Sequence, residues 1–138
     1  MDSFLQKSPV AILCTHNSDG TIHAAPVWFQ YNTNNEILFA TQDDTRRIKN
    51  IKKNPDVTVV VETEQLPYKG VVIYGKANLD YDNVLPRRTA MYEKYMPHAN
   101  AEKLAKGLGA MRKAVLIRVR PSKITSYDYG KDQSGLFK

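Results

Sequence analysis

Short runs of apolar and β-branched residues, separated by polar turns, make up most of the chain. Runs of this length and composition are typical of strands, and alternation of apolar and polar positions within them indicates one buried face. The pattern predicts strands at residues 10–15, 21–31, 36–40, 57–63, 70–79, 114–120 and 124–127. The run at 57–63 is almost wholly β-branched, which favours either burial on both faces or a place on the inside of a barrel.

Polar segments set the turns and a few helices between these strands. Asp-Gly at the end of residues 17–20 favours a tight hairpin because it tolerates positive φ, and residues 32–35 predict a second turn. The return strand contains Pro26, which indicates an edge, a bulge or a break. Helical patterns occur at residues 3–7, 45–54, 83–95 and 98–108. Many short strands joined by turns, with a few short helices, predict a mainly β fold of about six strands closed into a barrel.

Composition limits the class of protein. A length of 138 residues fits one domain over residues 1–138. The single cysteine, Cys14, excludes an internal disulfide and fits a reducing cytoplasm. No apolar run approaches the roughly 18 residues that span a membrane, and residues 1–10 lack the apolar segment of a signal peptide. We therefore expect a cytoplasmic protein without membrane contact, with a loop at 65–69 and a polar tail at 131–138 that is frayed or docked on a partner.

The net charge of +6 suggests an anionic partner, either nucleic acid or a phosphorylated ligand. The positive residues are spread over several segments of the chain. Aromatic residues are not interleaved with them as they are in sheets that stack RNA bases. A nucleic-acid-binding barrel is therefore disfavoured.

The segment Thr45-Arg46-Arg47, at a predicted helix start, carries the most specific chemistry. A helix start presents unpaired N–H groups and the positive end of the dipole, which together attract anions. A hydroxyl and two guanidinium groups there can grip a phosphate, whereas without an anion the dipole disfavours cations at this end. The alternative is a solvated surface turn, partly neutralised by Asp43 and Asp44. The pattern alone leaves both open.

Other chemistry-bearing residues give weaker indications. Cys14, His16 and His23 surround the first hairpin, but a zinc site needs three or four ligands at suitable spacing, so exposed polar residues are favoured and no metal is expected. The chain contains no nucleophile elbow and no glycine-rich phosphate loop. Trp28, the only tryptophan, is expected in the core or an interface, or as a wall for an aromatic ring beside the anion site.

Resemblance to a known family lies in the stretch HAAPVWFQYNTNNEILFATQDDTRRIKNIKKNPDVTVVVE, followed by VVIYGKANL and AVLIRVRPSKITSYDYGK. These segments resemble the flavin-binding split-barrel family typified by pyridoxamine 5'-phosphate oxidase, over about residues 5–130. The most specific part is the spacing between Thr41, the Thr45–Arg47 segment and the Asn54-Pro55 helix end. The resemblance implies a six-stranded, Greek-key-like split β-barrel that works as a homodimer, with FMN bound in clefts between the protomers.

The resemblance also implies roles for individual residues. Arg46 and Arg47 match the family's phosphate-gripping pair, with a hydroxyl from Thr45 and further charge from Lys49. The other positions implied for the cofactor line or border its ring; they are Ala40 and Thr41 on one strand, Ala25, Pro26, Val27, Trp28 and Phe29 on another, and Tyr127 near the C-terminus.

The chain departs from the oxidase at several positions. This chain has Ala25 where the oxidase has an arginine, and it aligns Gly70 with a flavin-contacting glutamine. It has no clear match for the arginine and histidine that hold the phosphorylated vitamin. We therefore expect the chain to act on a small molecule other than pyridoxamine phosphate.

The resemblance leaves the cofactor and the activity open. Small relatives bind a deazaflavin coenzyme and a few bind haem, but Thr45-Arg46-Arg47 is closer to the flavin pattern, so FMN is favoured. The favoured function is an FMN-dependent oxidoreductase, in which the cofactor carries the chemistry. The alternatives are a deazaflavin-dependent reductase of the same fold and a non-catalytic flavin carrier. Nothing in the sequence selects an acid–base catalyst, although Tyr127 and His98 are candidates by residue type.

Overall fold

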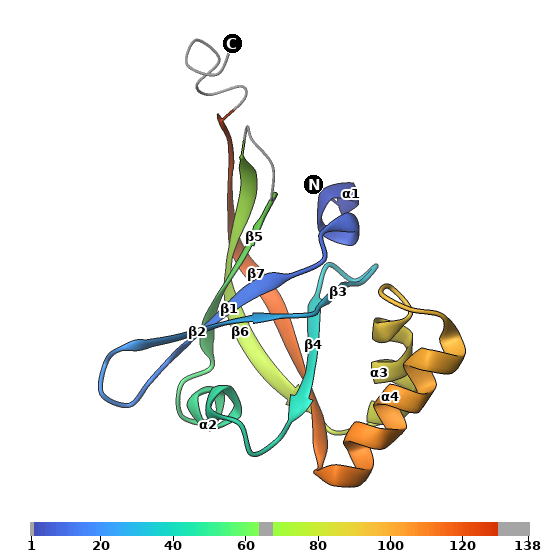
Figure 1. The fold of residues 1–138 in the computed structure, drawn as a ribbon. Coiled ribbons are helices and arrows are strands. Elements are labelled where there is room, and N and C mark those ends of the chain that lie inside the picture. Colours follow the sequence, from blue (N-terminus) through green and yellow to red (C-terminus); the bar gives the residue numbers. More distant parts are fainter. Residues whose placement is uncertain (1, 64–67, 130–138) are drawn as a thin grey trace.

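The computed structural model of the protein describes residues 2–63 and 68–129 (Figure 1). The predicted loop at 65–69 lies largely outside these residues, and the tail at 131–138 lies wholly outside them. No helix in the described part of the chain is long and apolar enough to cross a membrane. The elements, in chain order, are α1 (Asp2–Lys7), β1 (Ala11–His16), β2 (Ile22–Val27), β3 (Gln30–Tyr31), β4 (Ile37–Gln42), α2 (Arg46–Lys53), β5 (Asp56–Glu62), β6 (Lys69–Asp80), α3 (Val84–Tyr92), α4 (His98–Met111) and β7 (Ala114–Asp128).

The seven strands of the described residues form one antiparallel sheet, in the order β2-β1-β5-β6-β7-β4-β3. The two edge strands, β2 and β3, are consecutive in the chain and are separated only by Trp28 and Phe29. So short a link brings the two edges toward each other, and the sheet curls into a half-barrel (Figure 1). The structure therefore confirms a mainly β split-barrel fold, with seven strands where six were expected.

The polar turns adopt the geometry that their residues predict. Gly20 has a φ of +89° at the first hairpin, and Asn35 has a φ of +58° at the second. Pro26 lies on the edge strand β2, which is a position that tolerates proline. The predicted return strand is interrupted after Val27, where Phe29 turns into the core and is fully buried.

The later strands differ in part from the expectation. Side chains of β5 alternate between buried and less buried positions, so its β-branched run lines the inside of the barrel and is not buried on both faces. The prediction of separate strands at 114–120 and 124–127 is wrong, because both belong to β7. A register shift between Tyr74 and Gly75 of β6 gives β7 an irregular pairing beside Pro121. Such a bulge lets a strand accommodate a proline without ending.

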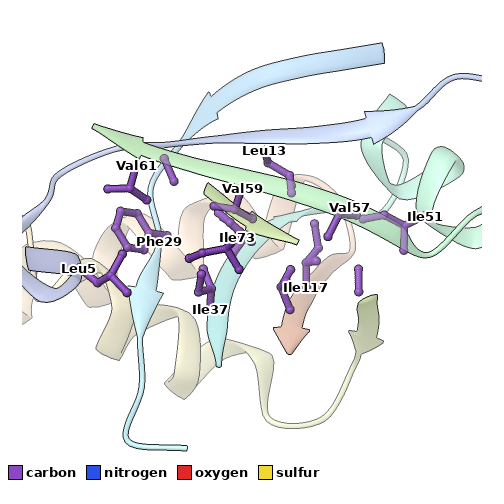
Figure 2. Packing of buried hydrophobic residues seen from close by; sticks show 14 of the residues in the cluster. Leu5, Leu13, Phe29, Ile37, Ile51, Val57, Val59, Val61, Ile73 and Ile117 are labelled. Carbon is purple, nitrogen blue, oxygen red and sulfur yellow. The ribbon is translucent and has the colours of Figure 1, made fainter. Parts of the chain in front are cut away.

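Two hydrophobic clusters lie on the two sides of β4. The curled sheet encloses the main core, in which Ile37 lies among residues of several other strands (Figure 2). Phe39 belongs to the same cluster. A second cluster packs helices α3 and α4 against the sheet and includes Leu38 and Leu116. Successive β4 side chains enter the two clusters in turn, because neighbours on a strand point to opposite faces.

One buried carboxylate is held by arginines near the start of β4. Glu36 is 6% exposed, and its Oε2 accepts a hydrogen bond from Arg118 Nη2 at 2.9 Å, with Arg120 Nη2 at 3.5 Å. Burial raises the pKa of Glu36, but the hydrogen bonds from Arg118 and Asn32 and the two positive charges outweigh it, so the pKa is lowered overall. The charged form of Glu36 therefore contributes to stability near neutral pH.

Candidate cofactor site

Helix α2 follows β4 directly and is attached to the sheet along one side. Ile48 and Ile51 are buried in the main core, as their i, i+3 spacing predicts. Asn50 Nδ2 donates hydrogen bonds to Thr15 Oγ1 at 3.0 Å and to Asn17 Oδ1 at 2.9 Å. These contacts fix the position of the helix start relative to the end of β4.

The first turn of α2 has no side-chain cap. Thr45 occupies the N-cap position, as predicted, but its hydroxyl donates to the Gln42 carbonyl at 3.2 Å and makes no capping hydrogen bond. The first turn also contains no acidic residue. Its N–H groups therefore lack the side-chain acceptor that a threonine at this position usually supplies, and the positive end of the dipole is not offset locally.

Arg47 is a partly buried cation whose hydrogen-bond partner is neutral. Its Nη2 donates to Thr41 Oγ1 at 3.1 Å, and burial lowers the pKa of the guanidinium. Among the described residues, no carboxylate lies within ion-pair distance of Arg47 or Arg46. The neighbouring Asp44 instead pairs with Arg112 at 3.1 Å. A desolvated cation without a counter-charge favours an external anion at this position.

The other predicted residues of this region divide between two faces. Thr41 is buried and contacts Arg47, whereas Ala40 packs against the second cluster beneath α3 and α4. Lys49 is exposed on α2, one turn beyond Thr45. Thr41, Thr45, Arg47 and the α2 N-terminus are therefore brought together, and the side chain of Ala40 is not among them.

Residues 25–27 form the end of β2 that is remote from the first hairpin, to which α2 is attached, and Trp28 comes directly after them. Ala25 pairs with Leu13 on β1, and Trp28 follows the strand. Trp28 is 39% exposed; its ring stacks on Tyr95 with centroids 4.3 Å apart and meets Tyr92 edge-on at 5.4 Å. Trp28 therefore presents a partly exposed aromatic face that two tyrosine rings hold in place.

The residues that hold Trp28 were not among those predicted from the sequence. Tyr95 Oη donates to a carbonyl of the segment before β1 at 2.6 Å, and the Phe29 N–H donates to Tyr95 Oη at 3.2 Å. Lys94 Nζ donates to the Phe29 carbonyl at 3.2 Å, and burial lowers the Lys94 pKa to about 8. The i, i+3 spacing of Tyr92 and Tyr95 in a predicted helix was the available signal.

Tyr127 lies near the far end of β7. Val115, near the start of β7, pairs with Thr41, so Tyr127 is twelve residues further along the strand. At about 3.3 Å per residue this is roughly 40 Å along the strand. Tyr127 donates a hydrogen bond to Glu62, and burial together with Glu62 and Tyr129 raises its pKa to about 12. Within one chain, Tyr127 is therefore remote from the α2 N-terminus.

The sequence residues considered for zinc do not converge. Cys14 and His16 lie two positions apart on β1 and so share one face, whereas His23 pairs with Thr15 on the other face. Among the residues that the structure describes, no group of three or more His, Cys, Asp or Glu side chains could hold a metal ion. His98, which was an acid–base candidate by residue type, is exposed and pairs with Glu93 at 2.7 Å.

The family follows from a comparison with protein-family models. The model described as pyridoxamine 5'-phosphate oxidase matches residues 1–128. The chain belongs to this family. No curated protein matches the chain. The resemblance to this family implied a phosphate site at Thr45, Arg46 and Arg47, which in the structure is the uncapped start of α2, with Arg47 beside Thr41.

Solved structures of the family's fold are similar at low sequence identity. Conserved hypothetical protein Rv2991 from Mycobacterium tuberculosis is 21% identical with a TM-score of 0.78, covering 96% of this chain and 84% of that one. An F420 reductase is 22% identical with a TM-score of 0.71, over 90% and 94% of the two chains. HutZ, the heme storage protein from Vibrio cholerae, is 16% identical with a TM-score of 0.70, over 91% and 89%. The pyridoxamine 5'-phosphate oxidase fold therefore occurs in proteins with different named functions.

Proposed function

We propose that the chain is an FMN-dependent oxidoreductase that acts on a small molecule. The observation that carries the proposal is Arg47, a partly buried cation that lacks a carboxylate partner among the described residues, beside the uncapped N-terminus of α2. Helix starts of this kind bind phosphate through N–H groups and dipole, and an arginine adds a bidentate, charge-assisted contact. Membership of the pyridoxamine 5'-phosphate oxidase family supports a flavin phosphate as that anion.

The residues of the chain would divide the work of binding. Arg46, Arg47 and Thr45 hold the phosphate, and the exposed Lys49 adds positive potential. The backbone of residues 25–29 borders the ring, and Trp28 excludes water from that side. FMN supplies hydride or electron transfer when bound, while the protein sets its position and electrostatic surroundings.

A homodimer completes this site in our proposal. The roughly 40 Å of β7 between the α2 region and Tyr127 means that Tyr127 can border the same cofactor only from a second copy. Tyr74 and Ile124, on the paired strands β6 and β7, are 41% and 43% exposed, which provides apolar surface for such a contact. The free thiol Cys14 fits the cytoplasm as the location.

A deazaflavin coenzyme is the second candidate. The similarity to an F420 reductase, with a TM-score of 0.71, favours it. A carrier that binds flavin without turnover is the third, favoured by the similarity to a heme storage protein of the same fold. Both keep the same anion-binding role for Arg47, because F420 and FMN each carry a phosphate.

The test is purification of the full chain, followed by absorbance spectra and mass spectrometry of the molecule that co-purifies. We expect FMN, and we expect NADH or NADPH to reduce it and a small acceptor to reoxidise it. Bound F420 in its place would refute the cofactor assignment in favour of the second candidate. Bound FMN that no donor reduces would favour the carrier. Protein that neither retains nor takes up any of these cofactors would contradict all three.

A further inference from the structure

A separate cavity lies between helices α3 and α4 and the start of β7. Its volume is about 300 Å³, at the lower end of the roughly 300–1,000 Å³ that ligand pockets occupy. Gln42 borders this region through Arg88, whereas the preceding Thr41 faces Arg47. The cavity is therefore on the opposite side of β4 from the proposed cofactor site. Its walls are Tyr81, Val84, Leu85, Arg88, Ala105, Gly109, Lys113 and Ala114.

The cavity contains a buried arginine whose partners are all neutral. Arg88 is 4% exposed; its Nε donates to Tyr92 Oη at 2.8 Å and its Nη1 to Gln42 Oε1 at 3.4 Å. Among the described residues, no carboxylate lies within ion-pair distance of it. These two contacts use a minority of the five N–H donors of a guanidinium. Burying a cation without a counter-charge is costly, so an anion in the cavity would stabilise it.

Two acidic residues of the surrounding elements are engaged by other arginines. Asp80, at the end of β6, pairs with Arg87 at 2.8 Å and lies 3.6 Å from Arg118. Asp44 pairs with Arg112 at 3.1 Å. In the described part of the chain, the cavity lining contains no acidic residue. The charge of Arg88 is therefore not balanced by these neighbours.

A second cation and an apolar wall complete the cavity. Lys113 Nζ lies 4.6 Å from the ring centroid of Tyr81, which also lines the cavity. Tyr81 and Leu85 are 41% and 42% exposed, so apolar surface is open at the cavity. The remaining lining is mostly aliphatic. Two cations beside apolar walls suit a ligand that joins an anionic head to an apolar body.

We propose that this cavity binds a small organic carboxylate with an apolar or aromatic body. The carboxylate lies between Arg88 and Lys113, and the body lies against Tyr81 and Leu85. The inference is independent of the proposed function, because it uses none of the residues assigned to the flavin cofactor.

The experiment is isothermal titration of the full chain with benzoate as the probe, carried out on the protein as purified and repeated with FMN added. We expect saturable benzoate binding, and at least about tenfold weaker binding of benzyl alcohol, which lacks the charge, and of acetate, which lacks the ring. Arg88→Met should abolish benzoate binding, and Lys113→Gln should weaken it about tenfold. Lys103→Gln is the matched control, because it removes an exposed lysine of α4 that does not line the cavity, and it should leave binding unchanged.

Several results would overturn the proposal. They are the absence of saturable benzoate binding up to about 10 mM, equal affinity for benzoate and inorganic phosphate, or displacement of FMN by benzoate. Retained binding in folded Arg88→Met would do the same. Should Arg88→Met fail to fold, the comparison of Lys113→Gln with Lys103→Gln decides, and equal affinities in that pair contradict the proposal.

Discussion

Replacing Arg47 by methionine separates its effect on cofactor binding from its effect on folding. Methionine keeps an apolar stem of similar length and removes the charge and the fork of donors. In the protein without cofactor, the loss is one hydrogen bond to Thr41, worth about 1 kcal/mol, offset by relief of a desolvated cation that has no carboxylate partner among the described residues. The free energy of unfolding should therefore change by no more than about 1 kcal/mol.

Cofactor binding should respond much more strongly. Two charge-assisted hydrogen bonds from Arg47 to a phosphate, at about 1.5–3 kcal/mol each, imply a loss of at least about 3 kcal/mol, or roughly a 150-fold rise in Kd. Urea unfolding with and without FMN measures both quantities. At an FMN concentration of about 100 times its Kd, the wild-type chain should gain about 2.7 kcal/mol, and Arg47→Met should gain little.

A matched control and an opposite outcome make this test decisive. Lys53→Met removes the same charge from the last turn of α2, where the dipole favours a cation, and FMN should stabilise this variant as it does the wild type. Arg47→Lys should recover part of the affinity, since it keeps the charge without the fork. Arg47→Met protein that loses several kcal/mol without FMN but still gains the full stabilisation with FMN would refute the reasoning.

Three further changes test the fold. Glu36→Gln should lower the free energy of unfolding by about 1–3 kcal/mol at pH 7. Because the pKa of Glu36 is lowered in the folded state, the wild type should lose this stability as pH falls below about 4.5. Urea unfolding from pH 7 to 3 should show that loss in the wild type and not in the variant. Replacing both Gly107 and Gly109 by alanine should raise the free energy of unfolding by about 0.5–1 kcal/mol per site, and the urea midpoint with it, since neither added Cβ meets an atom within 4 Å; a lowered midpoint would contradict this. Tyr95→Phe should lower the free energy of unfolding by about 1–2 kcal/mol, measured by urea unfolding with the fluorescence of the single tryptophan as the signal. An unchanged free energy of unfolding would show that the Tyr95 hydroxyl does not stabilise the fold.

Local chemistry made the turns and the helix start predictable. Asp-Gly at Gly20, the Asn-rich second turn and the Thr45 N-cap position each act through neighbours within a few residues, so the sequence contains the needed information. The buried face of α2 followed from the spacing of Ile48 and Ile51. These features therefore agreed between pattern and structure.

Features that depend on distant pairing were not predictable from the pattern. The continuity of β7 through Pro121 depends on the register shift in β6 between Tyr74 and Gly75, and Gly75 is 46 residues away from Pro121 along the chain. The lack of a capping bond from Thr45 depends on its hydroxyl turning to Gln42. The neutral surroundings of Arg47 and Arg88 depend on which arginines engage the acids nearby, which only the folded chain decides.

The start of α2 is the proposed binding site for the phosphate of the cofactor. Riboflavin has the ring and ribityl chain of FMN without the phosphate, so the ratio of the two dissociation constants isolates that contact. By fluorescence titration, wild-type protein should bind FMN at least about 100-fold more tightly than riboflavin, and the double variant Arg46→Ala, Arg47→Ala should bind the two within about threefold of each other. Equal affinity of the wild type for both ligands, or an unchanged ratio in the double variant, would contradict the account.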